Sequence, residues 1–253
     1  MHQPTEPPFP DHFSAAAAGY ARHRPTYPRA LVEFLAGLTQ RHELAWDCGC
    51  GSGQLSGLLA GRYARVIATD ASAEQLRNAR PRARVEYRLA RAEASGLPHA
   101  AVDLAVAAQA AHWFELEAYY AEVRRAARAG AAVALVTYDL MSVDPDVDPL
   151  VRRFYSDVVG AYWPPQRRHT EDGYRSLAFP FAEVAAPALE MCRHWTLSDV
   201  LGYIATWSSV SAMRRAEGPA RYHEFGRELA RVWSSGPPVR AVRWQLALRA
   251  GRL

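Results

Sequence analysis

Three alternating glycines behind an acidic residue are the part of the sequence with the most direct chemical meaning. They lie in the run Asp47-Cys48-Gly49-Cys50-Gly51-Ser52-Gly53, and a second acid, Asp70, follows later in the chain. Glycine permits the backbone angles of a tight turn and lets a ligand approach the main chain closely. A carboxylate at the end of the next strand can accept hydrogen bonds from both hydroxyls of a ribose. The pattern therefore predicts a site for a nucleotide-type ligand.

Two other glycine patterns fit this loop poorly. In the dinucleotide pattern G-x-G-x-x-G, which would begin at Gly49, Gln54 takes the place of the third glycine, and no Gly-Lys-Ser/Thr of a phosphate loop follows. The acid Asp47 at the head of the loop also disfavours a pyrophosphate and suits a cationic amino group. A nicotinamide dinucleotide is therefore the weaker alternative.

The segments around the loop alternate in a way that predicts a parallel sheet. Short β-rich runs (residues 43–47, 65–70, 85–89, 102–108 and 131–138) are separated by segments of helical periodicity (residues 29–40, 55–63 and 115–128). Strands that alternate with helices at this spacing indicate crossover connections. Ser72 is a predicted N-cap, with Gln75 placed as in a capping box.

The second half of the chain has a different pattern. Residues 141–187 are rich in proline and aromatic residues, and we expect residues 141–182 to form a helical or irregular cap over the ligand edge of the sheet. A strand within residues 183–194, helices at 197–214 and 220–233, and a last strand at 239–250 complete the prediction. Residues 1–12 are expected to be a flexible tail, and residues 13–253 a single domain.

Composition narrows the function classes. The net charge is +4, but the basic residues are dispersed, which argues against a nucleic-acid partner. No apolar run approaches membrane-spanning length, so no membrane partner is expected. The three cysteines have no zinc-type spacing, and Cys48 and Cys50 are too close in the loop to form an easy disulfide. This predicts a reduced cytoplasmic protein without a metal. The oligomeric state is not predicted.

In Asp47, the three alternating glycines and Asp70, the sequence resembles class I S-adenosylmethionine-dependent methyltransferases of the UbiE-like, methyltransferase domain 11 type. The resemblance covers roughly residues 13–138 and recurs at the C-terminus. It implies a doubly wound, mainly parallel, seven-stranded Rossmann-like sheet whose last strand is antiparallel. The runs 20–28, 107–114 and Thr206-Trp207-Ser208 are similar to the trans-aconitate 3-methyltransferase-like branch, whose members often methylate small carboxylates or other small metabolites.

The resemblance and the positions at strand ends together define a predicted cofactor site for S-adenosylmethionine. The glycine loop would pass the amino-acid part of the cofactor, Asp70 would bind the ribose, and the segment before Leu97-Pro98 would line the adenine. The predicted cofactor residues are Tyr20, Arg24, Asp47, Gly49, Gly51, Gly53, Asp70, Ala71, Ala92, Glu93, Gln109 and Ala110.

The acceptor side is predicted in less detail. His112 follows the fourth strand, so it could act as a base, orient the acceptor or only pack within its loop. The predicted substrate residues are Trp113, Tyr162, Trp163 and Trp207, and the surrounding segment adds Tyr155, Arg167, Arg168 and His169. A carboxylate acceptor would need no general base. The leading hypothesis is a small-molecule methyltransferase; a cofactor-binding protein without catalysis and an NAD-dependent oxidoreductase are the alternatives.

Overall fold

A mixed sheet runs through the chain, and its strands follow the order β3-β2-β1-β4-β5-β8-β6, with β7 paired to β8. The structure is a computed structural model that describes residues 25–253. Its strands are β1 (Leu44–Cys48), β2 (Arg65–Asp70), β3 (Val85–Leu89), β4 (Val102–Ala108), β5 (Ala127–Tyr138), β6 (Ala182–Val184), β7 (Leu189–Thr196) and β8 (Val239–Arg252). Neighbours among β1 to β5 are parallel, whereas β8 is antiparallel to β5. The predicted α/β class with an antiparallel last strand is confirmed.

The expected number of seven strands is wrong, because the sheet in residues 25–253 has eight. The segment expected to hold one strand forms β6 and β7, with Pro187 in the gap between them. Proline has no amide to donate to a ladder and interrupts such pairing. The 14-residue strand β8 accommodates both pieces, since its C-terminal end pairs with β6 and its N-terminal half pairs with β7.

The sheet is buried on both faces because successive side chains of a strand point to opposite sides. In β1, Ala45 belongs to one hydrophobic cluster and Trp46 to the other. In β2, Val66 and Ile67 divide in the same way. This two-sided burial explains why the central strands are nearly continuous apolar runs.

The helix α2 (Arg29–Gly37) precedes β1, and short helices follow the parallel strands: α3 (Gln54–Leu59), α4 (Ala73–Arg77), the 3-10 turn η2 (Ala111–Trp113) and α5 (Leu116–Ala126). Ser72 caps α4 by accepting from the Gln75 amide at 3.3 Å, as predicted. The other half of a capping box would be a bond from the Ser72 amide to the Gln75 side chain, but this amide donates to Asp70 Oδ1. The start of α4 is therefore tied to the acid that ends β2.

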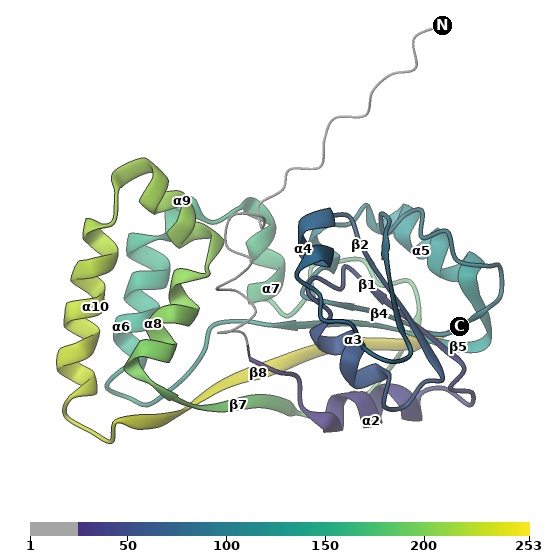
Figure 1. Cartoon of the computed structure of the whole chain (residues 1–253), viewed down its shortest axis with the longest axis horizontal. Helices are drawn as coiled ribbons and strands as arrows, with labels where there is room; N and C mark the ends of the chain where they lie inside the picture. Colours follow the sequence, from purple (N-terminus) through teal and green to yellow (C-terminus); the bar gives the residue numbers. More distant parts are fainter. Residues whose placement is uncertain (1–24) are drawn as a thin grey trace, which may run out of the picture.

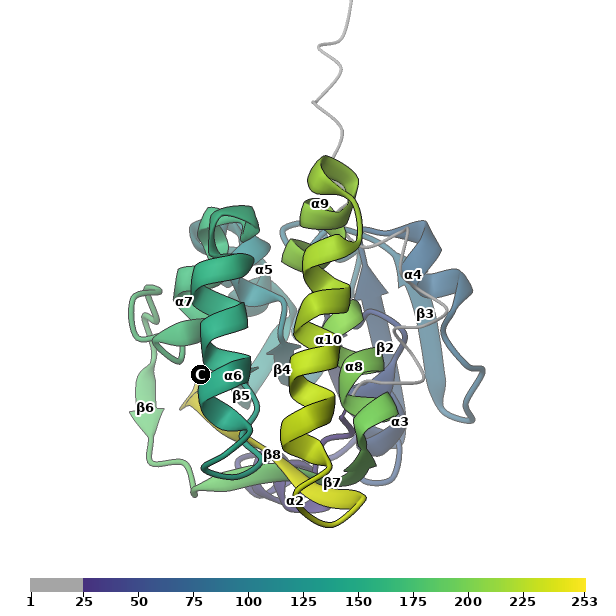
Figure 2. The same ribbon diagram turned by 90° about the vertical axis from the view of Figure 1, so that its left-hand side faces the viewer.

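A helical layer stands beside the long strands β7 and β8 (Figures 1 and 2). It contains α6 (Asp148–Arg153), its π-helical continuation η3 (Phe154–Val158), η4 (Gly160–Tyr162), η5 (Pro165–Arg167), α7 (Arg168–Glu171), α8 (Leu197–Ala205), α9 (Ser208–Glu217) and α10 (Ala220–Trp233). Phe154 stacks on Phe225 of α10 at 4.0 Å between ring centroids. Residues 141–182 therefore supply only part of this layer.

One predicted helix is divided in the structure. The helix expected over residues 197–214 is interrupted at Thr206-Trp207, which separates α8 from α9. Among the helices of residues 25–253, none has the length and apolar character needed to cross a membrane.

Candidate functional site

The predicted glycine loop connects β1 to α3 at the carboxyl edge of the sheet. All three glycines have left-handed backbone angles, with φ of +68° at Gly49, +55° at Gly51 and +79° at Gly53. The Gly49 amide donates to the carbonyl of Thr69 in β2 at 2.8 Å, which anchors the loop to the neighbouring strand. Such angles are readily adopted only by glycine. The sequence pattern therefore reflects a real backbone requirement.

The space around the glycines differs from one to the next. A Cβ on Gly49 would overlap the Cβ of Ala110, and a Cβ on Gly53 would overlap the ring and hydroxyl of Tyr87. A Cβ on Gly51 would meet only the side-chain oxygen of Gln75, at 3.7 Å. Close packing thus explains two of the three glycines. At Gly51 a Cβ would make only an ordinary contact, so packing does not explain this glycine and its backbone angle does.

Asp70 lies at the end of β2 and is bonded to this same loop. Its Oδ2 accepts from the Gly51 amide and its Oδ1 from the Ser72 amide, both at 2.8 Å. The residue is half-buried, and the two hydrogen bonds hold its carboxylate beside the loop. The neighbouring Ala71, also predicted as a cofactor residue, is half-buried in the bend that follows. A carboxylate in this position suits a ligand with vicinal hydroxyls.

Asp47 is turned away from solvent. It is 1% exposed, and its Oδ2 accepts from the Ser56 hydroxyl at 2.5 Å. Burial raises the pKa of Asp47 to about 7, with a further rise from the nearby Asp70, while the Ser56 hydrogen bond lowers it. The carboxylate therefore links β1 to α3 beneath the loop.

The predicted adenine segment forms a turn between β3 and β4. Ala92 is buried, and Glu93 is half-buried with Oε1 accepting from the Glu115 amide at 3.0 Å. The other oxygen of Glu93 pairs with Arg91 at 3.3 Å. Both carboxylate oxygens of Glu93 are thus used within the protein, where they join this turn to the start of α5.

Gln109 and Ala110 follow β4 and serve the structure directly. Gln109 has a φ of +55°; its amide nitrogen donates to the Tyr138 carbonyl and its amide oxygen accepts from Thr137, both at 2.8 Å. Ala110 is buried against Gly49. These two residues bind the end of β4 to β5 and to the glycine loop.

His112 lies in η2, immediately beyond Ala110 and Ala111. Its Nδ1 is 2.7 Å from the Tyr174 hydroxyl, and its ring is 5.0 Å from that of Trp113. Burial lowers the pKa of His112 to about 3, and the charges of Arg167 and His169 lower it further. His112 is therefore a neutral imidazole near neutral pH.

An aromatic cluster in the helical layer packs against a half-buried arginine. The guanidinium of Arg167 lies over the rings of Trp163 and Tyr155, at 4.9 and 5.4 Å from their centroids. Its Nε donates to the Tyr155 hydroxyl at 2.7 Å and one Nη2 hydrogen goes to Asp139 at 2.9 Å. Trp207 is buried 5.7 Å from both aromatic rings. We name this set the arginine box.

The arginine box and His112 belong to one region, because η5, which carries Arg167, contacts η2. Of the predicted residues, Trp113 lies beside His112 in η2, and Trp163 and Trp207 belong to the arginine box. Tyr162 is not joined to them by its polar group, since its hydroxyl donates to Glu217 at the end of α9. Tyr20 and Arg24 lie outside the described residues.

Two residues of this region were not selected from the sequence. Asp139 follows β5, and the only available signal was its position at a strand's carboxyl end. Tyr174 is fully buried with a φ of +66° and reaches His112 across 62 positions of sequence. No local pattern marks such a contact.

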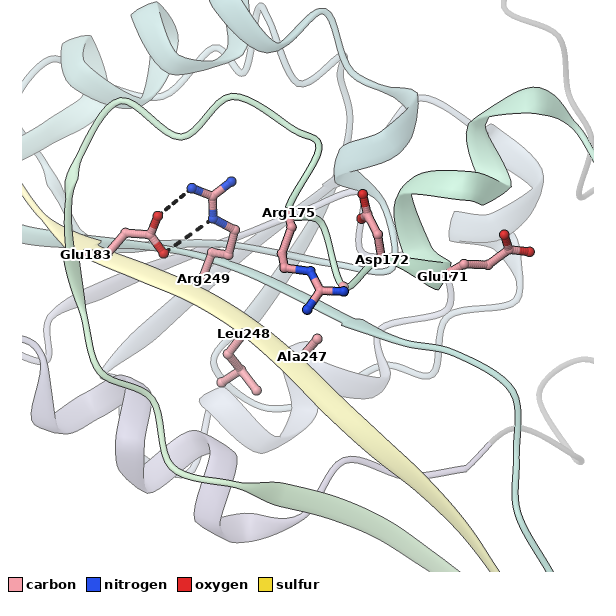
Figure 3. Close-up of a pocket in the computed structure, with 8 residues that line it drawn as sticks. Glu171, Asp172, Arg175, Glu183, Ala247, Leu248 and Arg249 are labelled. Carbon is pink, nitrogen blue, oxygen red and sulfur yellow. Dashed lines mark hydrogen bonds and ion pairs between the residues drawn. The ribbon is translucent and has the colours of Figure 1, made fainter.

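An open depression lies between the segment after α7, which contains Gly173 and Arg175, and residues 247–249 of β8 (Figure 3). None of the predicted site residues lines it; Arg249 does, and its guanidinium pairs with Glu183. Arg249 Nη1 also donates to the carbonyls of Tyr174 and Leu177, at 3.1 and 2.6 Å. The depression is therefore the outer side of the turn that presents Tyr174.

Residues 25–253 contain no group of three or more His, Cys, Asp or Glu side chains that could hold a metal ion. The groups present at this edge are a glycine loop with an acid beside it, a neutral histidine and a half-buried arginine among aromatic rings.

Comparison with known proteins bears on this arrangement. Residues 46–135, from β1 to β5, match the family model described as a methyltransferase domain. A proposed methyltransferase of Dictyostelium discoideum is 33% identical over 217 residues, which span 84% of this chain and 82% of the relative. The solved structure of a proposed type II methyltransferase from Anaeromyxobacter dehalogenans is 48% identical with a TM-score of 0.85, covering 90% of this chain and 97% of that one.

A third comparison agrees in fold alone. A proposed methyltransferase from an antibiotic biosynthesis pathway of Anabaena variabilis has a TM-score of 0.54 at 17% identity, with 90% of this chain and 99% of that one covered. The matched family region contains the glycine loop, Asp70 and His112, and the longer alignments extend through the helical layer. The chain belongs to the methyltransferase family.

Proposed function

We propose that this chain is an S-adenosylmethionine-dependent methyltransferase that methylates an oxygen of a small carboxylate. The observation that carries the cofactor part is the joint geometry of Gly51 and Asp70. Gly51 is the one glycine of the loop at which a Cβ would meet no overlapping atom, and its amide donates to Asp70 at 2.8 Å. When bound, the cofactor supplies a methyl group on a positively charged sulfur.

The residues of the loop fit such a cofactor. Asp70 would accept from the ribose hydroxyls, and Ala71, Ala92 and Glu93 would line the base. Asp47 would favour the cationic amino group from beneath the loop only in its ionised form, since its pKa is about 7 and its carboxyl is buried against Ser56. Gly49, Gly53, Gln109 and Ala110 would maintain the shape of the site. Tyr20 and Arg24 remain predicted contacts.

The acceptor part of the proposal rests on the arginine box. Within residues 25–253, Arg167 donates to Tyr155 and Asp139, and its other N–H groups would bind an anion. A guanidinium fork binds a carboxylate through parallel charge-assisted hydrogen bonds. Trp113, Trp163 and Trp207 would supply apolar walls, with Tyr162 at the outer side.

A carboxylate acceptor also agrees with the state of His112. A carboxylate is already a nucleophile at neutral pH, so transfer depends mainly on holding its oxygen in line with the methyl group. A histidine whose pKa is about 3 is a weak base, and a phenol or alcohol acceptor would need a stronger one.

The free thiols of the three cysteines support a reducing compartment such as the cytoplasm.

Calorimetric titration with S-adenosylhomocysteine and with NAD tests the cofactor. We expect binding of the first, and a loss of about 10- to 150-fold in affinity for Asp70→Ala, because charged hydrogen bonds contribute about 1.5–3 kcal/mol. Asp157→Ala, which removes an exposed carboxylate from η3, is the matched control and should bind normally. Binding of NAD without S-adenosylhomocysteine would overturn the proposal.

Catalysis needs a separate measurement, since a methyltransferase fold can hold its cofactor without turnover. Transfer of label from methyl-labelled S-adenosylmethionine to a panel of small carboxylic acids should give an ester product. Labelling of phenols or amines in preference to acids would refute the carboxylate assignment. Cofactor binding with no transfer to any member of the panel would favour the binding protein.

A further inference from the structure

Tyr174 touches the imidazole that faces the predicted acceptor. Its hydroxyl is 2.7 Å from Nδ1 of His112, and the two rings are 5.8 Å apart. Tyr174 is fully buried, whereas His112 is only half-buried. One nitrogen of the imidazole is therefore engaged inside the protein, and Nε2 is the nitrogen left for a ligand.

The backbone holds Tyr174 in an unusual conformation to make this contact. Gly173 and Tyr174 have φ values of +67° and +66°, a region that a tyrosine rarely adopts. The Tyr174 amide donates to the His169 carbonyl at 2.7 Å, and its carbonyl accepts from Arg249 at 3.1 Å. These bonds keep the strained turn in place and direct the ring from the cap to the edge of the sheet.

The direction of the hydrogen bond follows from acidity. A phenol is a stronger acid than a neutral imidazole N–H, and an imidazole nitrogen is a stronger base than a phenol oxygen. The better match is therefore an O–H donated by Tyr174 to Nδ1, and 2.7 Å is the usual length for an O–H donor. Burial raises the pKa of Tyr174, and the side chain of Thr137 and the backbone of His112 oppose that rise, so the hydroxyl is held among polar groups.

We propose that Tyr174 is a positioning residue that holds His112 as the neutral Nε2–H tautomer, so that His112 donates a hydrogen bond to the acceptor. This inference rests on the proposed function and adds the protonation state in which the acceptor binds. A histidine fixed in this way cannot remove a proton through Nε2. The acceptor must then arrive already deprotonated, and its carboxylate would be shared between the Nε2–H of His112 and the guanidinium of Arg167.

The charges around His112 agree with a donor role. Arg167 and His169 approach it from the cap, and Tyr174 occupies Nδ1. Positive neighbours disfavour an imidazolium, so the ring stays neutral while it still offers one N–H. A proton acceptor would gain from a nearby carboxylate, and no acidic group contributes to the pKa of His112.

Nitrogen-15 NMR of the full chain tests the tautomer without any acceptor. The protein has nine histidines, and comparison with His112→Gln identifies the signals of His112. Long-range proton–nitrogen correlations distinguish the two neutral tautomers. We expect the Nε2–H form at neutral pH in the wild type, and a tautomer ratio that shifts roughly five- to tenfold toward Nδ1–H in Tyr174→Phe, as loss of one hydrogen bond implies.

Tyr120→Phe is the matched control, because Tyr120 is equally buried and its hydroxyl donates to the Ala178 carbonyl at 2.7 Å. It should leave the His112 signals unchanged, which separates tautomer control from general loosening of the fold. A dominant Nδ1–H form in the wild type, or an unchanged ratio in a folded Tyr174→Phe, would overturn the inference. If Tyr174→Phe does not fold, the wild-type tautomer alone decides. Failure of S-adenosylhomocysteine to bind would refute the proposed function and leave this measurement intact.

Discussion

Asp47 should make the stability of the folded chain fall as the pH rises toward neutrality. Its pKa is raised from 3.8 to about 7, chiefly because the carboxylate is buried and secondly because Asp70 is near, while Ser56 opposes the rise. The folded state therefore keeps a proton that the unfolded state has released. This contribution to stability is complete below pH 3.8, declines as the pH rises, and is lost above about pH 7.

The size of the effect follows from the same values. Between pH 3.8 and 7 the free energy of unfolding should fall by about 1.4 kcal/mol per pH unit, or about 4 kcal/mol in all. Asp47→Asn has nearly the same shape and can still accept from Ser56, but it does not titrate. It should therefore lack this component of the pH dependence.

Urea unfolding at a series of pH values measures the difference between the two proteins. From about pH 4.5 to about pH 8, Asp47→Asn should gain about 3 kcal/mol relative to the wild type. Ser56→Ala is the second variant: it removes the bond that lowers the pKa of Asp47, so the decline should extend to higher pH. A constant difference between wild type and Asp47→Asn at every pH would refute the assignment.

Two further predictions test the loop and the arginine box. Gly53→Ala should lower the free energy of unfolding by at least about 1 kcal/mol more than Gly51→Ala, since only the first variant overlaps Tyr87, whereas Gly51→Ala should weaken S-adenosylhomocysteine binding more. Chemical denaturation and calorimetry measure both, and the reverse order would contradict the packing argument. Arg167→Lys keeps the charge but loses the fork held by Tyr155 and Asp139, so kcat/KM for carboxylic acids should fall about 10- to 100-fold with unchanged cofactor affinity. Equal losses for neutral acceptors in steady-state kinetics would count against a role in carboxylate recognition.

Much of the fold could be predicted because its signals are local. The parallel strands appear as short apolar runs, and the turn after β1 requires left-handed angles that only glycine adopts easily. The position of Asp70 beside Gly51 follows from the same logic, since parallel strands end at one edge of the sheet. The division of 183–194 into two strands was missed because it depends on the length of β8, which is distant in sequence.

The candidate site was predictable only to the level of its elements. Asp47 was expected to face a ligand, yet the fold turns its carboxylate inward to Ser56. Glu93 and Gln109 sit where predicted, but their polar atoms are used on neighbouring backbone and side chains. The direction of a side chain depends on which partners the finished fold brings within reach, and spacing carries no such information.

The amino-acid sequence by itself determined the class of the glycine loop, the alternation of strands and helices, and the acid at the end of β2. All of these arise from residues within one or two elements, whose backbone angles and periodicity are local properties. Only the tertiary structure decided that Tyr174 reaches His112, and that Arg167 is enclosed by Trp163 and Trp207. Those contacts join segments that are far apart in the chain, and they form because the helical layer packs against the sheet edge and brings these rings together.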